Sequence, residues 1–326
     1  MHRRDTAPSL FLNDSASVSA AKTSAESHLD VVAVVLNTLT IVLGIPGNSL
    51  VIWVVGCKPK SANVLNVWLI NLAMADLIFC ITRIFSLVKK LFLGHWPFGL
   101  FVCKFNGFCK QANMFGSVFM LAVISVDRAL CVRLPVFTRR HRTVCAARVV
   151  ATCVWLVVLA FSWPFFSKHS LMCNQDIAKC QMNNKNGLYV VRFLFGFLLP
   201  FLVILACYIL AGVGIHRTRL SGKGRVLGVL ALLVATFFLC WAPYHGLLIL
   251  KMVDRNCALL KTWMPLAKGV AFIKSGINPL LYFFVGMRMR TPAKKSLEGL
   301  SRNALADNPD GQTGQCNGLG LSKSEV

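Results

Sequence analysis

Charged residues, and acids above all, are scarce in this sequence of 326 residues. Asp, Glu, Lys and Arg make up 14% of it, whereas roughly 25% is usual for a soluble domain. The 12 acids face 35 Lys and Arg, which gives a net charge of +23. The sequence also has no P-loop, no HExxH zinc motif and no glycine-rich dinucleotide turn after a predicted strand. We therefore expect no catalytic residues, no cofactor and no enzyme activity.

Long apolar stretches dominate what the sequence does contain. Hydrophobic residues make up 56% of it, and its mean hydropathy is +0.63. Seven stretches of about 20 residues or more can each cross a hydrocarbon core of roughly 30 Å. They predict an all-α membrane protein, a seven-transmembrane helix bundle, and exclude a soluble enzyme, a disordered chain and a small disulfide-rich domain. The predicted spans are 29–55, 65–88, 100–133, 144–167, 187–215, 224–251 and 261–285.

Basic residues gather in the loops that follow the first, third, fifth and seventh spans. Loops with an excess of Lys and Arg face the cytoplasm. This predicts a multi-pass protein of the plasma membrane with its N-terminus outside and its C-terminus in the cytoplasm. The charges then serve orientation and contact with membrane lipid, and no nucleic acid is expected as a partner. These residues are Lys58, Lys60, Arg139, Arg140, Arg142, Arg217, Arg219, Lys223, Arg225, Arg288, Arg290, Lys294 and Lys295.

The chain is expected to have four parts. Residues 1–28 form a polar extracellular segment with a glycosylation acceptor at Asn13, and residues 29–285 form the membrane bundle. Apolar and basic residues then alternate in a way that predicts a short amphipathic helix, 286–300, on the inner membrane surface. Residues 301–326, in which Asn, Gly, Asp and Ser are prominent, predict a disordered tail.

The loops predicted to lie outside are basic too, which membrane orientation does not explain. They contain only two acids, Asp176 and Asp254. This surplus suggests an anionic ligand that is drawn in by long-range attraction. The basic residues are Lys89, Lys90, Lys168, Lys179, Lys185, Lys251, Arg255 and Lys261.

Polar residues inside the apolar spans are costly and therefore informative. One carboxylate among amides and a hydroxyl predicts a cation or proton site, although each residue alone could form a packing hydrogen bond between helices. Lys274 lies one helical turn before Asn278, on the same face of the seventh span. We expect Lys274 to approach the carboxylate as a built-in cation, which argues against the alternative occupant, a sodium ion. The polar residues are Asn48, Asp76, Asn113, Ser117 and Asn278.

Thirteen cysteines are present, most of them in or beside apolar spans as small buried hydrophobes. Four lie in segments predicted to be outside, where oxidising conditions permit a disulfide. The preferred pair is Cys103, at the outer end of the third span, with Cys180, in the loop before the fifth. Cys173 is the rival partner, and a bond between Cys173 and Cys257 is a further alternative.

Motifs in every span resemble the rhodopsin-like family of G-protein-coupled receptors, over residues 29–300. Any one of them is weak, but seven in the expected order are a strong signal. The motifs are Gly47-Asn48, Leu72-Ala73-Met74-Ala75-Asp76, Cys103 with Asp127-Arg128, Trp155, Pro200 with Tyr208, Cys240-Trp241-Ala242-Pro243 and Asn278-Pro279-Leu280-Leu281-Tyr282.

The resemblance implies that an agonist binds from outside and that an inhibitory-class G protein is activated inside. Arg128 would be the coupling residue, held at rest by Asp127. The inner end of the sixth span offers basic residues rather than an acid, so this lock rests on Asp127 alone and basal signalling is expected. Tyr208 and Tyr282 would approach Arg128 as the sixth span swings outward about Pro243.

The resemblance also assigns activation roles to Phe237 and Trp241, which precede Pro243 in the sixth span. Trp241 either packs in the core or rotates as a switch beside the proline kink, and periodicity does not choose between the two. Further expected partners are arrestin, recruited by phosphorylated tail serines, and a PDZ protein at Ser324-Glu325-Val326.

Within this family the chain is most similar to the chemoattractant receptors, which comprise formyl-peptide, anaphylatoxin, chemerin and leukotriene receptors. Such receptors drive leukocyte chemotaxis or inflammatory signalling. Some motifs resemble formyl-peptide and anaphylatoxin receptors, such as His95-Trp96-Pro97-Phe98-Gly99 and Val191-Arg192-Phe193. Others resemble leukotriene receptors, such as Gly44-Ile45-Pro46-Gly47-Asn48-Ser49 and Trp241-Ala242-Pro243-Tyr244-His245. The subgroup therefore stays open.

Arg192 matches the position at which peptide-binding relatives hold a C-terminal carboxylate. Three more cations are expected in its pocket, with no acid among them, so a bound carboxylate or phosphate would relieve their repulsion. Formyl-peptide recognition is not expected, because Gln111 stands where those receptors have an acid. The predicted ligand-binding residues are Arg192, Lys110, Lys268, Arg83, Gln111, Met114, Trp241 and Tyr244.

Two ligand classes fit this pocket, a peptide with a free C-terminal carboxylate and an acidic lipid mediator. A leukotriene- or prostaglandin-type lipid receptor is therefore one alternative function. A non-signalling scavenger receptor is another, favoured by Ala129 in place of the usual aromatic residue after Arg128 and opposed by the intact Tyr208 and Tyr282. A transporter or channel is disfavoured because the two halves of the chain show no repeat.

Overall fold

The computed structural model describes residues 9–56, 63–174, 177–182, 186–218 and 221–306. The chain divides into two compact units, Met1–Tyr282 and Phe283–Val326, and each is considered by itself.

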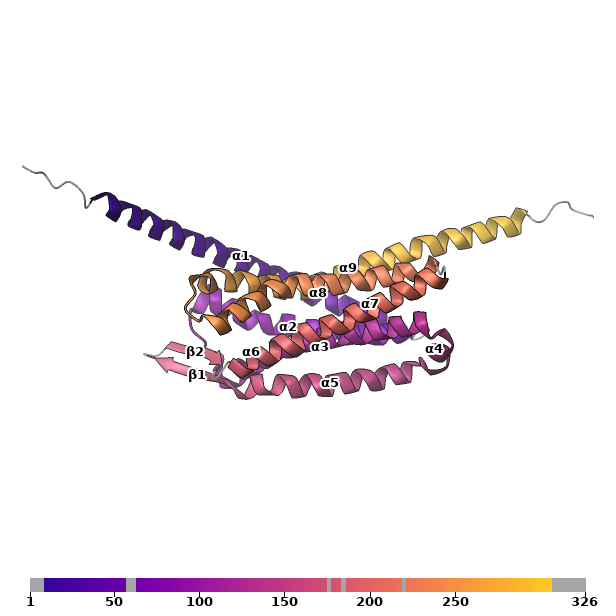
Figure 1. Cartoon of the computed structure of the whole chain (residues 1–326), viewed down its shortest axis with the longest axis horizontal. Helices are drawn as coiled ribbons and strands as arrows, with labels where there is room; N and C mark the ends of the chain where they lie inside the picture. The colour runs from indigo at the N-terminus through magenta and orange to yellow at the C-terminus, as the bar shows by residue number, and fades with distance from the viewer. Residues whose placement is uncertain (1–8, 57–62, 175–176, 183–185, 219–220, 307–326) are drawn as a thin grey trace, which may run out of the picture. The chain divides into compact units, whose positions relative to one another are not determined.

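The first unit is a bundle of long helices (Figure 1). Helix α3 packs against α2, α5 and α7, and α1 packs against α2. The helical elements in chain order are α1 (Ser9–Gly56), α2 (Val64–Val88), the π-helical turn η2 (Lys89–Leu93), α3 (Gly99–Arg133), α4 (Pro135–His141), α5 (Val144–Ser167), α6 (Asn186–Phe193), the π-helical turn η3 (Leu194–Leu198), α7 (Leu199–Thr218), α8 (Ser221–Val253) and α9 (Ala258–Ala306), whose last residues belong to the second unit.

Six segments of these helices are long and apolar enough to cross a membrane, judged by length and composition. Each coincides with a predicted span, and the seventh predicted span, 261–285, lies within α9. This part of α9 is more polar because it contains Lys268 and Lys274. The predicted seven-helix, all-α membrane bundle is confirmed. The six segments are Ser27–Gly56, Val64–Leu93, Gly99–Arg133, Val144–Ser167, Gly187–Gly214 and Leu230–Val253.

Helix α3 lies at the core of the bundle. Phe115, Val118 and Leu121 on this helix are at most 1% exposed. Beside it, Trp155 of α5 donates a hydrogen bond from Nε1 to Asn71 Oδ1 of α2 over 2.9 Å. This bond satisfies two polar groups away from water and joins the two neighbours of α3 to each other.

Between α5 and α6 the chain forms an antiparallel hairpin of two strands, β1 (His169–Asn174) and β2 (Ile177–Met182). Leu171 lies opposite Cys180 in its register. The sequence predicted only a loop here. Six-residue strands carry little local pattern, and this pair is fixed by cross-strand hydrogen bonds and by a tertiary bond at Cys180.

The second unit is helical from Phe283 to Ala306. The predicted amphipathic helix 286–300 falls in this part, and its place on a membrane surface stays a prediction. The helix includes the first residues of the predicted tail 301–326, of which 307–326 lie outside the described residues. At the other end of the chain, the predicted segment 1–28 is helical from Ser9, and the side chain of Asn13 lies outside the described residues.

Candidate functional site

A buried polar cluster surrounds the carboxylate of Asp76, which is 0% exposed. Asn113 Nδ2 and Ser275 Oγ each donate to its Oδ1 over 2.7 Å. Asn278 Nδ2 donates to its Oδ2, also over 2.7 Å. Lys274 Nζ lies 3.3 Å from Oδ1 and 3.5 Å from Oδ2. Four donors from α3 and α9 therefore satisfy one carboxylate of α2.

The ammonium of Lys274 has a second partner in this cluster, because its Nζ donates to Ser117 Oγ over 2.7 Å. Lys274 is 1% exposed and Ser117 is 0% exposed. An isolated buried ammonium is very costly, whereas a paired and hydrogen-bonded one is tolerated. Asn48 donates hydrogen bonds to the backbone oxygens of Gly44 and Ser275 over 2.8 and 3.0 Å, and of these two residues Ser275 binds Asp76. Asn48 therefore supports α9 rather than contacting the carboxylate.

The residues of this cluster do not fit a sodium ion at Asp76. Both carboxylate oxygens already accept hydrogen bonds, and Lys274 supplies the balancing positive charge beside them. Among the described residues, no group of three or more His, Cys, Asp or Glu could hold a metal ion. Ser275 belongs to the cluster but was not predicted from the sequence. A serine in a helix commonly bonds to its own backbone, so it does not stand out.

Near the C-terminal end of α3, Asp127 is shared between two arginines. Arg128 forms an ion pair with it, and its Nε donates to Asp127 Oδ2 over 2.9 Å. Arg142, directly after α4, donates from Nε to Oδ1 over 2.7 Å and from Nη2 to Oδ2 over 3.2 Å. The sequence placed Arg142 among the orientation charges. In the structure it binds the same carboxylate as Arg128.

The remaining residues expected to act in coupling lie in α7, α8 and α9. Tyr208 and Tyr282 pack against the hydrophobic core. The hydroxyl of Tyr282 is buried and has no hydrogen-bond partner among the described residues. Pro243 lies inside α8. Pro279 packs so closely against Gly47 of α1 that a side chain at position 47 would clash with its ring.

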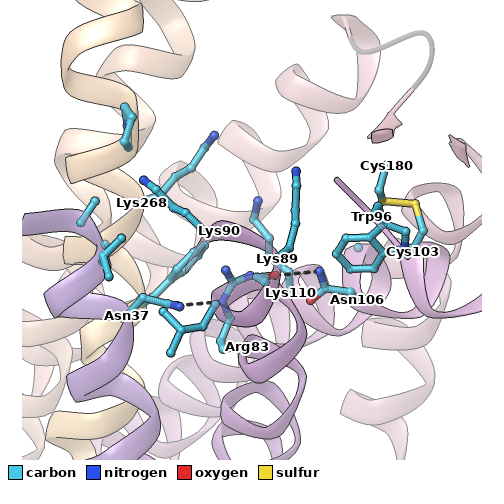
Figure 2. Close-up of a pocket in the computed structure, with 18 of the residues that line it drawn as sticks. Asn37, Arg83, Lys89, Lys90, Trp96, Cys103, Asn106, Lys110, Cys180 and Lys268 are labelled. Carbon is cyan, nitrogen blue, oxygen red and sulfur yellow. Dashed lines mark hydrogen bonds between the residues drawn. A yellow bond between two sulfur atoms is a disulfide. The ribbon is translucent and has the colours of Figure 1, made fainter. Parts of the chain in front are cut away.

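A cavity of about 560 Å³ opens at the end of the bundle that carries Cys103 and Cys180, called here the disulfide end. Helices α1, α2, α3 and α9 line it together with η2 and the hairpin. Figure 2 shows cationic side chains gathered around one space, and no Asp or Glu is among the described residues that line it. The cations are Arg83, Lys89, Lys90, Lys110 and Lys268. This space is called the Arg83 cavity.

Two neighbours fix the position of Arg83 at this cavity. Its Nε donates to Asn37 Oδ1 of α1 over 3.1 Å. Its Cζ lies 4.6 Å from the ring centre of Phe272 in α9, within the range of a cation–π contact. The Nζ of Lys110 lies 5.6 Å from the same ring centre. Arg83 and Lys110 thus share one aromatic side chain.

A second cavity, of about 300 Å³, is lined by α3, α6, α8, α9 and the hairpin and is called the Arg192 cavity. Lys110 and Lys268 line both cavities. Arg192 is the second-last residue of α6, two residues before the first residue of the π-helical turn η3, and is 4% exposed. One of its terminal nitrogens donates to the hydroxyl of Tyr244. Its buried Nε has no hydrogen-bond partner among the described residues.

Gln111 adds a neutral polar group to the Arg192 cavity. It is 2% exposed, and its Oε1 also lacks a hydrogen-bond partner among the described residues. Tyr189 and Lys251 line this cavity as well, although the sequence did not place them in the pocket. Met114 and Trp241, which the sequence predicted as ligand-binding residues, are buried in the bundle and are not among the described lining residues of either cavity.

Trp241 connects the Arg192 cavity to the core of the bundle. Its ring packs edge-on against Tyr244, with ring centres 5.7 Å apart, and lies 5.9 Å from the ring of Phe237. The Nζ of Lys274 lies 5.8 Å from the ring centre of Phe237. A continuous series of contacts therefore leads from Arg192 to the buried polar cluster.

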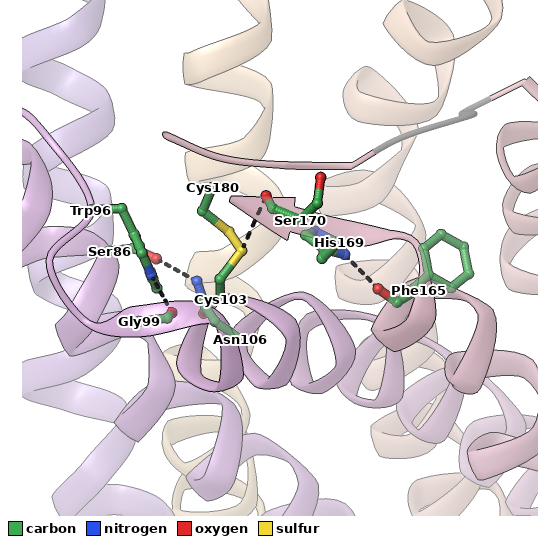
Figure 3. Close-up of a disulfide and its surroundings, with 9 residues drawn as sticks. All are labelled: Ser86, Trp96, Gly99, Cys103, Asn106, Phe165, His169, Ser170 and Cys180. Carbon is green, nitrogen blue, oxygen red and sulfur yellow. Dashed lines mark hydrogen bonds between the residues drawn. A yellow bond between two sulfur atoms is a disulfide. The ribbon is translucent and has the colours of Figure 1, made fainter. Parts of the chain in front are cut away.

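The disulfide joins Cys103 of α3 to Cys180 of β2 (Figure 3). Cys180 lines both cavities, so the bond holds the hairpin beside them. The predicted pair is confirmed. The backbone N of Trp96 donates to the carbonyl of Ala178 over 2.8 Å and anchors the same strand. The thiol of Cys257 is free, and the side chain of Cys173 lies outside the described residues.

Comparison with known proteins agrees with this geometry. The family described as 7 transmembrane receptor (rhodopsin family) matches residues 47–282. The chain is 34% identical to the C3a anaphylatoxin chemotactic receptor of Oncorhynchus mykiss, over 85% of its own length and 80% of that protein. It is 35% identical to the fMet-Leu-Phe receptor of Oryctolagus cuniculus over 86% of both chains, and 32% identical to formyl peptide receptor 2 of Mus musculus over 87% of both. The chain therefore belongs to the rhodopsin family of seven-transmembrane receptors, in its group of chemoattractant receptors.

Proposed function

We propose that this receptor binds an anionic ligand at the disulfide end and then activates an inhibitory-class G protein through Arg128. The observation that carries the proposal is the buried guanidinium of Arg192, whose Nε has no partner among the described residues. A buried charged donor without a partner is costly, and a ligand carboxylate would remove that cost. A chemotactic role is supported by the C3a anaphylatoxin chemotactic receptor among its relatives.

The first choice of ligand is a peptide with a free C-terminal carboxylate. A guanidinium binds a carboxylate through paired hydrogen bonds. The buried Oε1 of Gln111 in the same cavity is an acceptor in need of a donor. A peptide has an N–H group next to its terminal carboxylate, whereas a simple fatty acid has none there. An acidic lipid mediator that carries a hydroxyl is the second candidate.

The proposed orientation places the disulfide end outside the cell. A disulfide persists under oxidising conditions, which applies to Cys103 and Cys180. The basic residues around Arg142 would then face the cytoplasm, in agreement with the charge bias of membrane proteins. The N-terminus would lie outside and the C-terminus inside. The tail serines and the PDZ-type terminus lie outside the described residues, so arrestin and PDZ binding stay predictions.

The test is inhibition of cyclic AMP formation in cells that express the wild type or Arg192→Ala, with and without pertussis toxin. The cells receive peptides with a C-terminal carboxylate, the same peptides as C-terminal amides, or acidic eicosanoids. We expect a toxin-sensitive response to the carboxylate peptides that Arg192→Ala loses. Lys104→Ala is the matched control, because Lys104 lies on α3 but is not among the described lining residues of either cavity.

The other outcomes assign the alternatives. Binding without any second-messenger response would favour the scavenger receptor. A response confined to the eicosanoids would favour the lipid receptor. A full response in Arg192→Ala would show that Arg192 does not bind the ligand carboxylate and would contradict the proposal.

A further inference from the structure

We infer that the ligand carries two separate acidic groups, and that the second one binds in the Arg83 cavity. This inference rests on the proposed function, in which the first acidic group binds at Arg192. It goes further because it defines the ligand class as a dianion with its two charges apart.

The two cavities meet at Lys110 and Lys268, which line both of them. Arg83 lines only the first cavity and Arg192 only the second. One acidic group at Arg192 therefore leaves the Arg83 cavity without an anion. The Arg83 cavity is also the larger one, at about 560 Å³ against about 300 Å³. A ligand that filled only the smaller cavity would leave the larger space next to it unused.

The positive charges around the Arg83 cavity favour the binding of an anion. Lys90 is compensated by Asp30 at the exposed rim, with 2.9 Å between Nζ and Oδ1. Three other cations of the cavity, Arg83, Lys89 and Lys110, form no ion pair with a described residue, and no Asp or Glu is among the described lining residues. Like charges in one site raise each other's energy, and a bound anion relieves this repulsion.

The guanidinium of Arg83 is already oriented before any ligand binds. Asn37 accepts the hydrogen bond from its Nε, and the ring of Phe272 lies against its face. Its terminal nitrogens make no hydrogen bond to a described residue, so they can form a paired contact with an acidic group. Binding to a side chain that is already ordered loses less conformational entropy. Figure 2 shows Arg83 held by Asn37 at the edge of the space that Lys110 and Lys268 share.

The experiment uses the full-length receptor in lipid nanodiscs and pairs of synthetic peptides of graded length. Every peptide ends in a free carboxylate. One member of each pair has an N-succinyl group, which adds a second carboxylate, and the other has a neutral N-acetyl group. The affinity ratio within a pair then isolates the second charge.

We expect the best succinyl peptide to bind about tenfold more tightly than its acetyl partner, as a charge-assisted contact predicts. In Arg83→Gln this ratio should fall to about one. Asn37→Ala keeps the charge but removes the acceptor that orients it, so it should lower the ratio in part. Lys104→Gln should leave the ratio unchanged.

Three results would overturn the inference in different ways. Equal affinities within every pair, with both members weakened by Arg192→Gln, would show that the receptor does not recognise a second acidic group. The proposed function would then remain intact. Absence of binding, or binding of both members that ignores Arg192→Gln, would remove the proposed function and this inference together. An unchanged ratio in Arg83→Gln would also reject the Arg83 cavity as the second site.

Discussion

Lys274 Nζ lies 3.3 Å from Asp76 Oδ1, and the two side chains are 2% and 0% exposed. This buried ion pair joins α9 to α2 at the centre of the polar cluster. The ammonium also binds Ser117 on α3, so one side chain connects three helices. A free cation at Asp76 would have to displace the ammonium of Lys274, which is covalently attached to the chain and cannot diffuse away.

Lys274→Asn should create sodium sensitivity that the wild type lacks. The shorter neutral side chain removes the built-in cation and leaves Asp76 with an uncompensated charge. Sodium at about ten times its Kd should then stabilise the variant by about 1.4 kcal/mol. The measurement is thermal unfolding in sodium chloride against choline chloride at equal ionic strength. Lys104→Asn, outside the cluster, is the control. A wild type that sodium stabilises equally well would show that Lys274 does not replace the ion.

Asp76→Asn should destabilise the protein more than removal of both charges does. The single change leaves the ammonium of Lys274 buried without its counter-charge, which costs about 3 kcal/mol or more. The double variant Asp76→Asn with Lys274→Met has no buried charge and should recover most of that loss. The free energy of unfolding in denaturant is the readout. A double variant less stable than Asp76→Asn alone would contradict this account.

The members of the polar cluster could be predicted from the sequence because polar groups inside apolar spans are rare and costly. Asp76, Asn113, Ser117 and Lys274 stand out for this reason, and the structure brings them together. Ser275 did not stand out, because its hydroxyl can be satisfied locally and its role appears only when α9 is placed against α2.

Other parts of the site depend on tertiary packing that no local pattern encodes. Arg142 is one of many basic residues in its loop, and only the position of α4 brings it to Asp127. The division of the pocket into two cavities depends on where the hairpin and α9 place Lys110 and Lys268. The sequence identified these cations as pocket residues, but it did not predict the boundary between the two cavities.

Arg142→Gln should lower basal signalling. In the wild type Asp127 divides its hydrogen bonds between Arg142 and Arg128. Without Arg142 the carboxylate serves Arg128 alone and holds it more firmly at rest. Partly exposed ion pairs contribute up to about 1 kcal/mol, so basal nucleotide exchange should fall by up to about fivefold. Asp127→Asn should raise it, because Arg128 then loses its partner. Basal binding of a non-hydrolysable GTP analogue in membranes measures both. Increased exchange in Arg142→Gln would show that Arg142 strengthens the lock instead.

Tyr244→Phe should tighten the binding of a carboxylate ligand. In the free receptor, the Tyr244 hydroxyl accepts a hydrogen bond from Arg192. The phenylalanine ring keeps the packing against Trp241 but leaves a second nitrogen of Arg192 without a partner. An unpaired buried donor costs about 1–3 kcal/mol, and the proposed ligand carboxylate relieves that cost on binding. The Kd of a peptide with a free C-terminal carboxylate should therefore fall by about tenfold, while that of its C-terminal amide should not. Tyr244→Leu, which removes the ring as well, separates packing from hydrogen bonding. Weaker carboxylate binding in Tyr244→Phe would mean that the hydroxyl itself contacts the ligand.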